Sequence, residues 1–378
     1  MKILIVGASM AGLSATIALR RRGHAVELYE RSRRDYQRSG GGIVAQKEMV
    51  RFLERYELAE PGELAVPAGD RVFLDIEGEV LERRPDKNAY TAWDTVYRRL
   101  RRKLPPGTLV SGKELVEVEE STAAVTLHFS DGTVASGDLL IGADGILSPT
   151  RRSVYPAATP EYAGYVAWRG VVPLATVKSR LDPILTSNFV VYSGEGTQIL
   201  AYPIPEAAGC NKPEQRRINF VWYESMDRDA AFARALTDRN GEAHSVAVPR
   251  GLIHPDIRSH IREHARTLLP TALAQLVCES EEPFVQGIFD LEMPRLIFGR
   301  VILLGDSGIL IRPHIGYGAS KAMSEADSLA EALGPANAPA DLILEGDALV
   351  RWEATTIRRG HELAARGKTI SRQHSLAC

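Results

Sequence analysis

The sequence has few cysteines and no long hydrophobic run, and both absences exclude classes of protein. Three cysteines, at positions 210, 278 and 378, are spread over 378 residues, and their odd number argues against a framework of disulfide bonds. No Cys/His cluster has the spacing of a metal site, so we expect no metal. No apolar run reaches the length that a membrane span needs. The first expected strand starts at residue 2 with no signal peptide before it, and we expect a cytoplasmic protein.

A strong net charge is also missing. Lys and Arg number 46 and Asp and Glu 48, which gives a net charge of −2 and no reason to expect a nucleic acid or a membrane as partner. Hydrophobic residues make up 44% and charged residues 25% of the chain, which is typical of a soluble globular protein. A chain of this length can bury one large core or two interlocked domains.

The N-terminal segment is organised as a strand, a glycine turn, a helix and a second strand. Ile3 to Val6 is a short run of mostly branched apolar residues, typical of a buried parallel strand. Residues 10–22 favour a helix, and Gly23 stands where a helix cap is expected. Ala25 to Glu30 then reads as a second strand that ends in an acid. The turn has the form Gly-x-Ser-x-x-Gly, which indicates a dinucleotide-binding βαβ unit.

Each residue of this turn has a physical task. Gly7 permits the sharp turn, a small residue at Ser9 lets the backbone approach a pyrophosphate, and Gly12 lets the helix pack close to the sheet. The first amides of the helix, from Met10 on, face the phosphate. The Glu30 carboxylate can accept hydrogen bonds from the ribose hydroxyls of an adenosine. The alternative is a tight strand-to-helix turn that binds no ligand.

Two later segments repeat the pattern of a buried strand followed by glycine and an acid. Residues 138–141 form an expected strand that leads into Gly142-Ala143-Asp144-Gly145. Residues 298–304 form another, followed by Gly305 and Asp306. An acid at the carboxyl end of a parallel strand lies where α/β sheets bind ligands. The second of these segments continues into a loop and an expected helix, residues 319–333.

Between these motifs the pattern changes to extended runs, which predicts an inserted sheet. We expect strands at residues 71–83 around a turn, and at 164–174, 189–204 and 217–224, with one or two helices over 254–276. A strand is also expected over 109–118, and a C-terminal helix over 342–368. The fold class is therefore α/β, with a discontinuous Rossmann-like domain (1–70, 94–160 and 286–335). A mostly antiparallel sheet domain (71–93 and 161–285) and a C-terminal helical segment (341–378) complete it.

The three motifs in this order resemble the class A flavoprotein monooxygenases, the FAD-dependent aromatic hydroxylases. The resemblance covers nearly the whole chain. Residues 162–171, 199–205 and 312–314 are similar to the branch that hydroxylates electron-rich pyridine rings. The resemblance implies a para-hydroxybenzoate hydroxylase-like fold and FAD as cofactor, with NADH or NADPH as co-substrate. It also implies that O2 forms a flavin C4a-hydroperoxide, which hydroxylates an aromatic or pyridine-type ring.

The resemblance also assigns roles in FAD binding. Ser9 and Met10 are expected at the pyrophosphate, and Glu30 with Arg31 at the adenosine ribose. The other expected contacts follow the cofactor from its adenine to its flavin ring: Leu115 at the adenine, Asp306 at the ribityl chain or pyrophosphate, Gly42 and Gln46 at the ribityl chain and ring, Pro313 at the reactive edge, and Gly316, Gly318 and Ala319 at the pyrimidine end. Asp144 is expected to support both FAD and the passing nicotinamide cofactor.

The base that activates the substrate can only be narrowed to a few candidates. His314 follows the proline at the flavin edge, and its ordinary titration range suits the task. Tyr202 and Tyr223 lie on expected strands of the inserted sheet, and alternation puts Gln198 on the face of Tyr202 and Asn219 on the face of Tyr223. Packing is the alternative role for each of these side chains. Tyr317 replaces the glutamine that the family has in this loop, and we expect it close to the substrate.

Two other functions stay open at this point. A flavin reductase or dehydrogenase on the same fold would use the same FAD motifs, and oxygen dependence of product formation would separate it from a hydroxylase. A flavin-binding module without turnover would belong to another class, and a colourless protein that takes up no flavin would favour that class. The identity of the ring, the choice between NADH and NADPH, and the oligomeric state are also open, a homodimer being one option.

Overall fold

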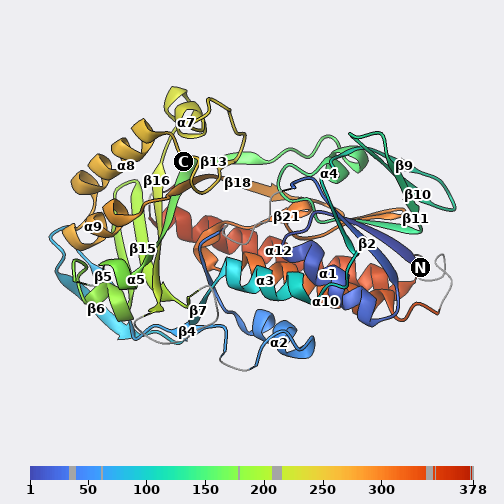
Figure 1. Cartoon of the computed structure of the whole chain (residues 1–378), viewed down its shortest axis with the longest axis horizontal. Coiled ribbons are helices and arrows are strands. Elements are labelled where there is room, and N and C mark those ends of the chain that lie inside the picture. Colours follow the sequence, from blue (N-terminus) through green and yellow to red (C-terminus); the bar gives the residue numbers. More distant parts are fainter. Residues whose placement is uncertain are drawn as a thin grey trace.

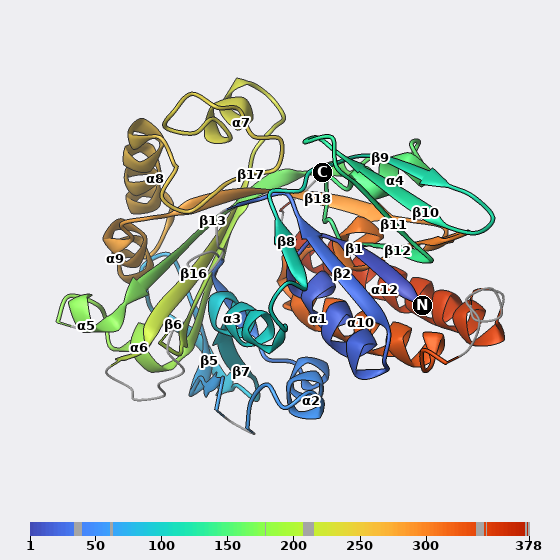
Figure 2. The ribbon, with the colours of Figure 1, turned by 45° about the vertical axis from the view of Figure 1, so that its right-hand side comes forward.

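The computed structural model describes residues 1–33, 40–60, 63–177, 179–206, 215–337, 344, 346–374 and 376. Two lobes lie side by side, each built around a sheet, and long strands run between them (Figures 1 and 2). Part of the loop expected before Gly40 and the start of the C-terminal helix expected at Leu342 fall outside the described residues. None of the described helices has the length and apolar character that crossing a membrane requires.

The first lobe contains a six-stranded sheet with β1 (Lys2–Val6) near its centre. β1 pairs in parallel with β2 (Ala25–Glu30) and β12 (Leu139–Gly142). The sheet continues with β8 (Leu109–Ser111) on one side and with β20 (Val301–Leu303) and β19 (Ile297–Phe298) on the other. The carboxyl ends of β1, β2, β12 and β20 therefore meet at one edge, which brings together the three motifs that follow them.

Helices cover one face of this sheet and a small sheet covers the other. The helices are α1 (Met10–Arg21), α3 (Trp93–Lys103), α10 (Gly318–Leu333) and α2 (Lys47–Arg55), which share one apolar core. On the opposite face, β9 (Leu115–Glu120), β10 (Val125–Phe129) and β11 (Val134–Gly137) pack against β1 and β12. α4 (Pro149–Val154) follows the Asp144 motif.

The second lobe contains the large sheet. Its strands in order are β17 (Ala247–Val248), β18 (Phe284–Glu292), β13 (Glu161–Pro173), β16 (Arg217–Ser225), β15 (Thr197–Ile204), β14 (Phe189–Gly194), β5 (Asp70–Leu74) and β6 (Val80–Pro85), with β21 (Ile309–Leu310) attached to β18. Only the β5–β14 pair is parallel among the pairings within this sheet. The outer face carries α7 (Ala230–Ala235), α8 (Pro255–Leu268) and α9 (Thr271–Glu279) over an apolar core.

Smaller elements join the lobes. A three-stranded sheet is formed by β3 (Gly42–Val44), β7 (Ala89–Ala92) and β4 (Val66–Pro67). The long helix α12 (Asp347–Gln373) packs along α10, β21 and β18, so it touches both lobes. The remaining short elements are α5 (Leu174–Val177), α6 (Ile184–Ser187) and the 3₁₀ helices η2 (Gly305–Ser307) and η3 (Pro313–Ile315).

The expected α/β fold with an inserted, mostly antiparallel sheet is confirmed, but some elements differ from expectation. The strand expected over 109–118 is two strands in different sheets, because Gly112 adopts a positive φ of 79° and turns the chain. The run 189–204 is a hairpin that turns at Gly196 (φ 64°). The boundary expected between residues 285 and 286 falls inside β18, whose pairing with β13 keeps it in the large sheet. α12 extends to Gln373, past the expected end.

Candidate active site

The turn between β1 and α1 leaves no room for larger residues. A Cβ on Gly7 would lie 2.3 Å from the Ala143 carbonyl oxygen, and one on Gly12 would lie 1.8 Å from the Gly7 oxygen. Gly7 also has a φ of 100°, which residues with a side chain rarely adopt. The turn therefore presses α1 against the sheet and brings it close to the Asp144 motif.

The N-terminus of α1 is open to an anion. Ser9 is exposed at the cap position and makes no side-chain capping bond, and no acidic residue stands in the first turn. Several amides at this end lack a helical partner and carry the positive end of the helix dipole. The Met10 side chain is buried, so only the backbone of Met10 is available to a phosphate. These features fit a pyrophosphate.

Glu30 closes β2 with its carboxylate turned toward this turn. Its two oxygens accept hydrogen bonds from the Ala8 amide at 2.9 Å and the Ser32 amide at 2.8 Å. Each carboxylate oxygen has two lone pairs and can accept more than one hydrogen bond, which suits the group to ribose hydroxyls. The neighbouring Arg31 is exposed, and the Lys113 amide donates to the Glu30 carbonyl at 2.9 Å. That bond brings the start of β9, with the buried Leu115, close to the end of β2.

The Asp144 carboxylate caps α4. One oxygen accepts a bond from the Ser148 hydroxyl, and the other accepts from the amide and hydroxyl of Thr150 at 3.0 and 2.7 Å. Burial raises the pKa of the Asp144 carboxyl, although these bonds oppose the shift. The side chain thus orders the local backbone, and the Asp144 Cα would lie 2.8 Å from a Cβ on Gly7.

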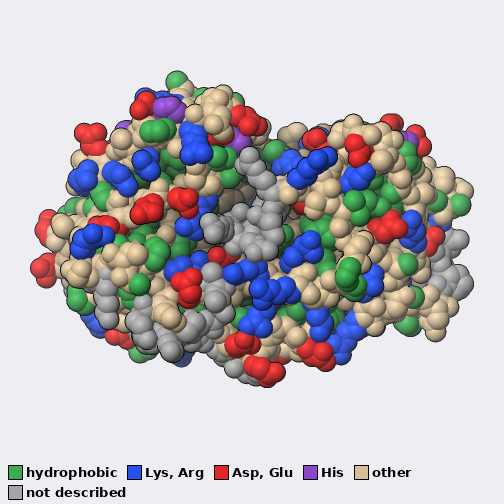
Figure 3. Space-filling model, in the orientation of Figure 1, with side chains coloured by type: hydrophobic (Ala, Val, Ile, Leu, Met, Phe, Trp, Pro, Cys, Tyr) green, Lys and Arg blue, Asp and Glu red, His purple; other side chains and the backbone are tan. Residues whose placement is uncertain are grey.

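Asp306 lies in η2, at the turn that follows β20. Its side chain is accessible to solvent, yet surrounding protein raises the pKa of its carboxyl by desolvation, and Lys321 opposes the shift. The space-filling view shows Lys and Arg side chains gathered over α3, between the two lobes (Figure 3).

A buried ion pair on α10 holds the turn that carries Asp306. Lys321 Nζ lies 2.9 Å from Glu325 Oε1 and donates to the Gly305 carbonyl at 3.1 Å. The other Glu325 oxygen accepts from the Gly305 amide at 2.9 Å. Arg151, which is 1% exposed, links this turn to the Asp144 motif by donating to the carbonyls of Ser307 and Ile146. The three motifs are therefore one rigid unit at the sheet edge.

The start of α10 offers a second open helix N-terminus. Tyr317 at the cap position makes no capping bond, the first turn contains no acid, and a Cβ on Gly318 would meet open space. Ala319 packs partly against the core beneath. Gly316 ends η3 with a φ of 59° and lies against Val44 of β3. This helix end and the β3 segment fit a flavin ring whose pyrimidine side carries partial negative charge.

Four predicted side chains of the large sheet share one face. In the register of β15 and β16, Gln198 pairs with Tyr223 and Tyr202 pairs with Asn219. We call this face, with Tyr165, Ala167, Arg169 and Val171 of the adjacent strand β13, the inner face. Asn219 Oδ1 accepts the Gly42 amide at 2.6 Å, and a Cβ on Gly42 would lie 2.6 Å from the Tyr202 ring. The inner face therefore closes directly onto the glycine segment expected at the flavin.

His314 contacts the opposite end of the inner face. Its Nε2 lies 2.9 Å from the Tyr165 hydroxyl, its Nδ1 lies 3.3 Å from Gln198 Oε1, and its ring is 4.1 Å from the Tyr223 ring. Because the Gln198 amide nitrogen donates to Ser193, its oxygen faces His314, which assigns the proton to Nδ1 and makes Nε2 the acceptor. Burial lowers the pKa of His314 to about 3, with smaller effects from His374 and Arg312.

His314 and the phenols of Tyr202 and Tyr223 are therefore uncharged at neutral pH, which leaves Arg169 as the cation of the inner face. His314 is neutral and its weakly basic nitrogen is already bonded. Burial raises the pKa of Tyr202 to about 12 and that of Tyr223 further, so both phenols keep their protons. No described residue forms a hydrogen bond with either phenol oxygen, and both can donate to a ligand.

Other predicted residues lie at the edges of this arrangement. Pro313 starts η3 beside His314. Gln46 occupies the cap position of α2. Its backbone N–H donates to the Val44 carbonyl at 3.0 Å. Arg359 of α12 donates to the Tyr317 hydroxyl, and its guanidinium lies over the Tyr317 ring. These contacts do not test the expected position of Tyr317 close to the substrate, which stays a prediction.

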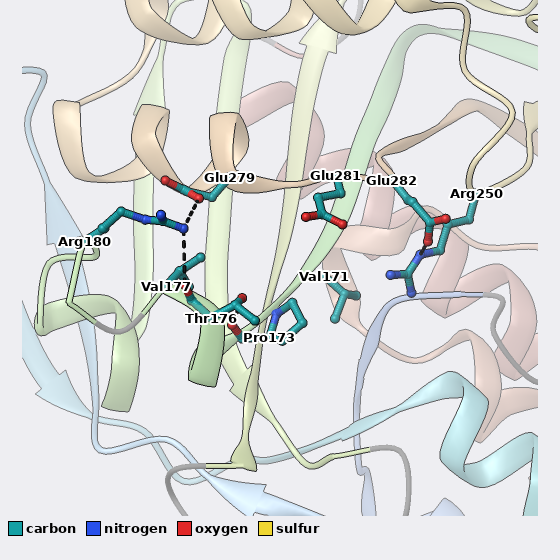
Figure 4. Close-up of a pocket in the computed structure, with 9 residues that line it drawn as sticks. All are labelled: Val171, Pro173, Thr176, Val177, Arg180, Arg250, Glu279, Glu281 and Glu282. Atoms are coloured by element: carbon teal, nitrogen blue, oxygen red, sulfur yellow. Dashed lines mark hydrogen bonds and ion pairs between the residues drawn. The ribbon is translucent and has the colours of Figure 1, made fainter.

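Leu376, near the end of the chain, has a contact that the sequence did not predict. Leu376 is fully buried against Tyr165 and Tyr223 of the inner face. A single leucine in a tail has no periodic pattern that would signal such a contact. A cavity of about 160 Å³ is lined by Val171 at the end of the inner face and by the ion pairs Arg180–Glu279 and Arg250–Glu282 (Figure 4).

Comparisons with known proteins agree with this geometry. A family model described as FAD binding domain-like matches residues 162–290, and one described as NAD(P)-binding Rossmann-like domain matches residues 5–35. The chain is 31% identical to 2,6-dihydroxypyridine 3-monooxygenase of Paenarthrobacter nicotinovorans, over 95% of this chain and 88% of that one. It is 29% identical to 3-amino-4-hydroxybenzoate 2-monooxygenase of Streptomyces cremeus, over 99% and 88% of the two chains.

Solved structures show the same similarity. The 2,6-dihydroxypyridine-3-hydroxylase of Arthrobacter nicotinovorans superposes with a TM-score of 0.86 at 29% identity, covering 99% of this chain and 92% of that one. A salicylate hydroxylase in complex with its substrate has a TM-score of 0.76 at 20% identity, covering 100% and 90% of the two chains, and this likeness concerns the fold alone.

Proposed function

The chain belongs to the FAD-dependent monooxygenases that hydroxylate aromatic and heteroaromatic rings, and from this premise we propose its ring class and the residues that hold the ring. It is an oxidoreductase that uses FAD and NAD(P)H. We propose that O2 is the oxygen donor and that the substrate is an electron-rich hydroxylated pyridine or phenol. The relatives that act on dihydroxypyridine and on 6-hydroxynicotinate support the pyridine class.

The residues at the sheet edge would hold FAD. The α1 amides around Ser9 would bind its pyrophosphate, Glu30 its adenosine ribose, and Asp306 its ribityl or pyrophosphate end. The open start of α10 and the Gly42 segment would receive the flavin ring. Bound FAD supplies the transfer of electrons from NAD(P)H and of oxygen to the ring.

The inner face would hold the substrate ring. The phenols of Tyr202 and Tyr223 would keep their protons and donate hydrogen bonds to a ring oxygen. His314 would stay neutral and fix the positions of Tyr165 and Gln198, and the packed aromatic residues would keep water from the reaction. The observation that carries this proposal is the Gly42–Asn219 bond, because it joins the expected flavin segment to the aromatic face.

The test measures NADH and NADPH oxidation and O2 uptake by the FAD-loaded protein across a panel of hydroxylated pyridines and phenols. We expect one compound to stimulate oxidation sharply and to leave as a product with one more oxygen. Rapid oxidation that no compound changes, with all electrons recovered as peroxide, would contradict the proposed ring class. Size-exclusion chromatography tests a homodimer, and fractionation of the source cells tests the proposed cytoplasmic location.

A further inference from the structure

Arg169 lies in the middle row of the inner face, on strand β13 at one side of it. Its register neighbours are Val221 on β16 and, one strand further, Leu200 on β15. This row lies between the row of Tyr202 and Asn219 and the row of Tyr223 and Gln198. Alternation along β13 directs the Arg169 side chain to the same side as these residues.

No described carboxylate neutralises the guanidinium of Arg169. It donates weakly to the Gly42 carbonyl, at 3.4 Å, and lies over the Phe284 ring at 5.6 Å. No described carboxylate forms an ion pair with it, and its buried Nε–H has no partner. Arg217 and Arg312, which also lie near this face, do have carboxylate partners. Arg217 donates two hydrogen bonds to Asp94, and Arg312 donates two to Asp290.

Apart from the Gly42 carbonyl, the polar side chains near Arg169 offer hydrogen-bond donors. The Nδ2 amide of Asn219, a residue with no exposed surface, is buried without a partner, while its oxygen is occupied by the Gly42 amide. The phenols of Tyr202 and Tyr223 add two free O–H groups, and the Arg169 charge opposes the effect of burial on both pKa values. Leaving buried donors and a charge unpaired is unfavourable unless a ligand provides the acceptor.

We propose, on the basis of the proposed function, that the substrate binds as an anion and that Arg169 is the residue that selects its negative charge. The charge is either a ring carboxylate or an ionised ring oxygen, and Asn219 Nδ2 donates to the same group. The Arg169 guanidinium can bind either group, because its planar N–H donors match the two oxygens of a carboxylate or a single ionised ring oxygen. Arg169 is thus a specificity-determining residue of the substrate site.

The test measures equilibrium binding of chosen ring compounds to the FAD-loaded protein, from the change in flavin absorbance. The first arm compares 6-hydroxynicotinate with its neutral amide. The second arm follows 2,6-dihydroxypyridine across the pH range in which its hydroxyl ionises. The wild type, R169Q and R169K are compared, with R250Q as control, because Arg250 is an arginine of the same lobe that already has a carboxylate partner, Glu282 (Figure 4).

We expect the wild type and R250Q to prefer the anion in at least one arm by roughly 10- to 100-fold, the range of a hydrogen bond to a charged group. R169Q should lose this preference and R169K should keep part of it. A preference for the anion in the first arm only would indicate that Arg169 binds a carboxylate. A preference in the second arm only would indicate that it binds a ring oxyanion. The proposal is overturned if the wild type binds the charged and neutral forms equally well, or if no anion binds to it. It is also overturned if R169Q keeps the preference for the anion. These wild-type results decide the matter even if R169Q does not fold.

Three further outcomes separate this inference from its premises. Loss of FAD from folded R169Q would overturn it, because Arg169 would then serve the cofactor. Hydroxylation of a neutral ring, equally fast in the wild type and R169Q, would overturn the anion inference but leave the proposed function intact. Absence of oxygen transfer to any ring, together with an Arg169-dependent anion preference, would overturn the proposed function and leave the anion site.

Discussion

On the inner face, the side chains that can titrate are uncharged except for Arg169. Burial lowers the pKa of His314 to about 3 and raises that of Tyr202 to about 12, so both side chains are neutral over the physiological range. Arg169, by contrast, keeps its charge without a carboxylate beside it. A ring that arrives with a negative charge would meet one cation and several neutral donors, an arrangement that orients it without proton transfer.

The depressed pKa of His314 predicts how stability depends on pH. Between about pH 6.5 and 3 the unfolded chain binds a proton at this residue that the folded chain does not, so stability falls as pH falls through this window. The loss amounts to at most about 1.4 kcal/mol per pH unit. We expect H314N to show a shallower fall in melting temperature from pH 7 to 4 than the wild type.

The control for that experiment is the exposed His260 of α8, whose replacement by Asn should leave the slope unchanged. The pKa values of His24 and His374 are also lowered by burial, so some pH dependence of the same sign should remain in H314N. An identical slope in H314N and the wild type would show that His314 is not held neutral.

Glu30 predicts a specific loss of cofactor affinity. E30Q keeps the shape of the side chain but removes the charge that ribose hydroxyls would meet, and it disturbs the bonds to Ala8 and Ser32. We expect the Kd of FAD, measured by fluorescence titration of the apoprotein, to rise roughly 10- to 100-fold, as for loss of a hydrogen bond to a charged group. E27Q, on the same strand but with a side chain 41% exposed, should bind FAD normally. Equal affinities for E30Q and E27Q would remove Glu30 from the site.

At the scale of elements, α10 fixes the turn that carries Asp306. The Lys321 and Glu325 side chains are 3% and 11% exposed and hold both the amide and the carbonyl of Gly305. Removing one partner of a buried ion pair leaves the other charge uncompensated, which costs more than removing both. The helix therefore depends on the pair as a unit.

The effects of replacing Lys321 and Glu325 on the free energy of unfolding should therefore not be additive. K321M should lower the free energy of unfolding by about 3–5 kcal/mol, whereas K321M/E325Q should recover much of the loss, because glutamine is neutral and can still accept the Gly305 amide. Urea denaturation of the three proteins measures the difference. If the double variant is less stable than K321M, the Glu325 charge is stabilising even without Lys321. The Lys321–Glu325 pair would then not act as a unit.

Elements whose signals are local could be predicted from the sequence. The Gly7 to Gly12 turn, β2 with Glu30, and the Gly305-Asp306 turn all depend on residues close together in the chain, and alternation correctly put Gln198 with Tyr202 and Asn219 with Tyr223. The partners of His314 could not be predicted, because Tyr165 and Gln198 reach it from strands more than a hundred residues away. The partner of Tyr317 could not be predicted for the same reason, since Arg359 lies on α12.

At the scale of the whole molecule, contacts far apart in sequence hold the two lobes in one arrangement. Arg217 of β16 binds Asp94 of α3 with bonds of 2.9 and 3.2 Å, and both side chains are buried. α12 packs on β18 and on α10, and Leu376 beyond it is buried against the inner face. The tail of the chain is thus part of the substrate side of the molecule.

The burial of Leu376 predicts that the tail contributes to stability. L376A should lower the free energy of unfolding by about 2–5 kcal/mol, the usual cost of a cavity left by a buried leucine. V350A, at a position of α12 that is 61% exposed, should change it by no more than about 0.5 kcal/mol. Thermal or urea unfolding of the two variants provides the comparison, and equal stabilities would mean that the tail does not pack as described.

The central claim is that this molecule transfers one oxygen atom from O2 to an aromatic ring. The most direct measurement is mass spectrometry of the product formed under ¹⁸O2 with NAD(P)H and the ring that stimulates oxidation. The account predicts a product with one labelled oxygen that comes from the gas and not from water. An unlabelled product, or an unchanged ring with peroxide as the only oxygen product, would contradict it.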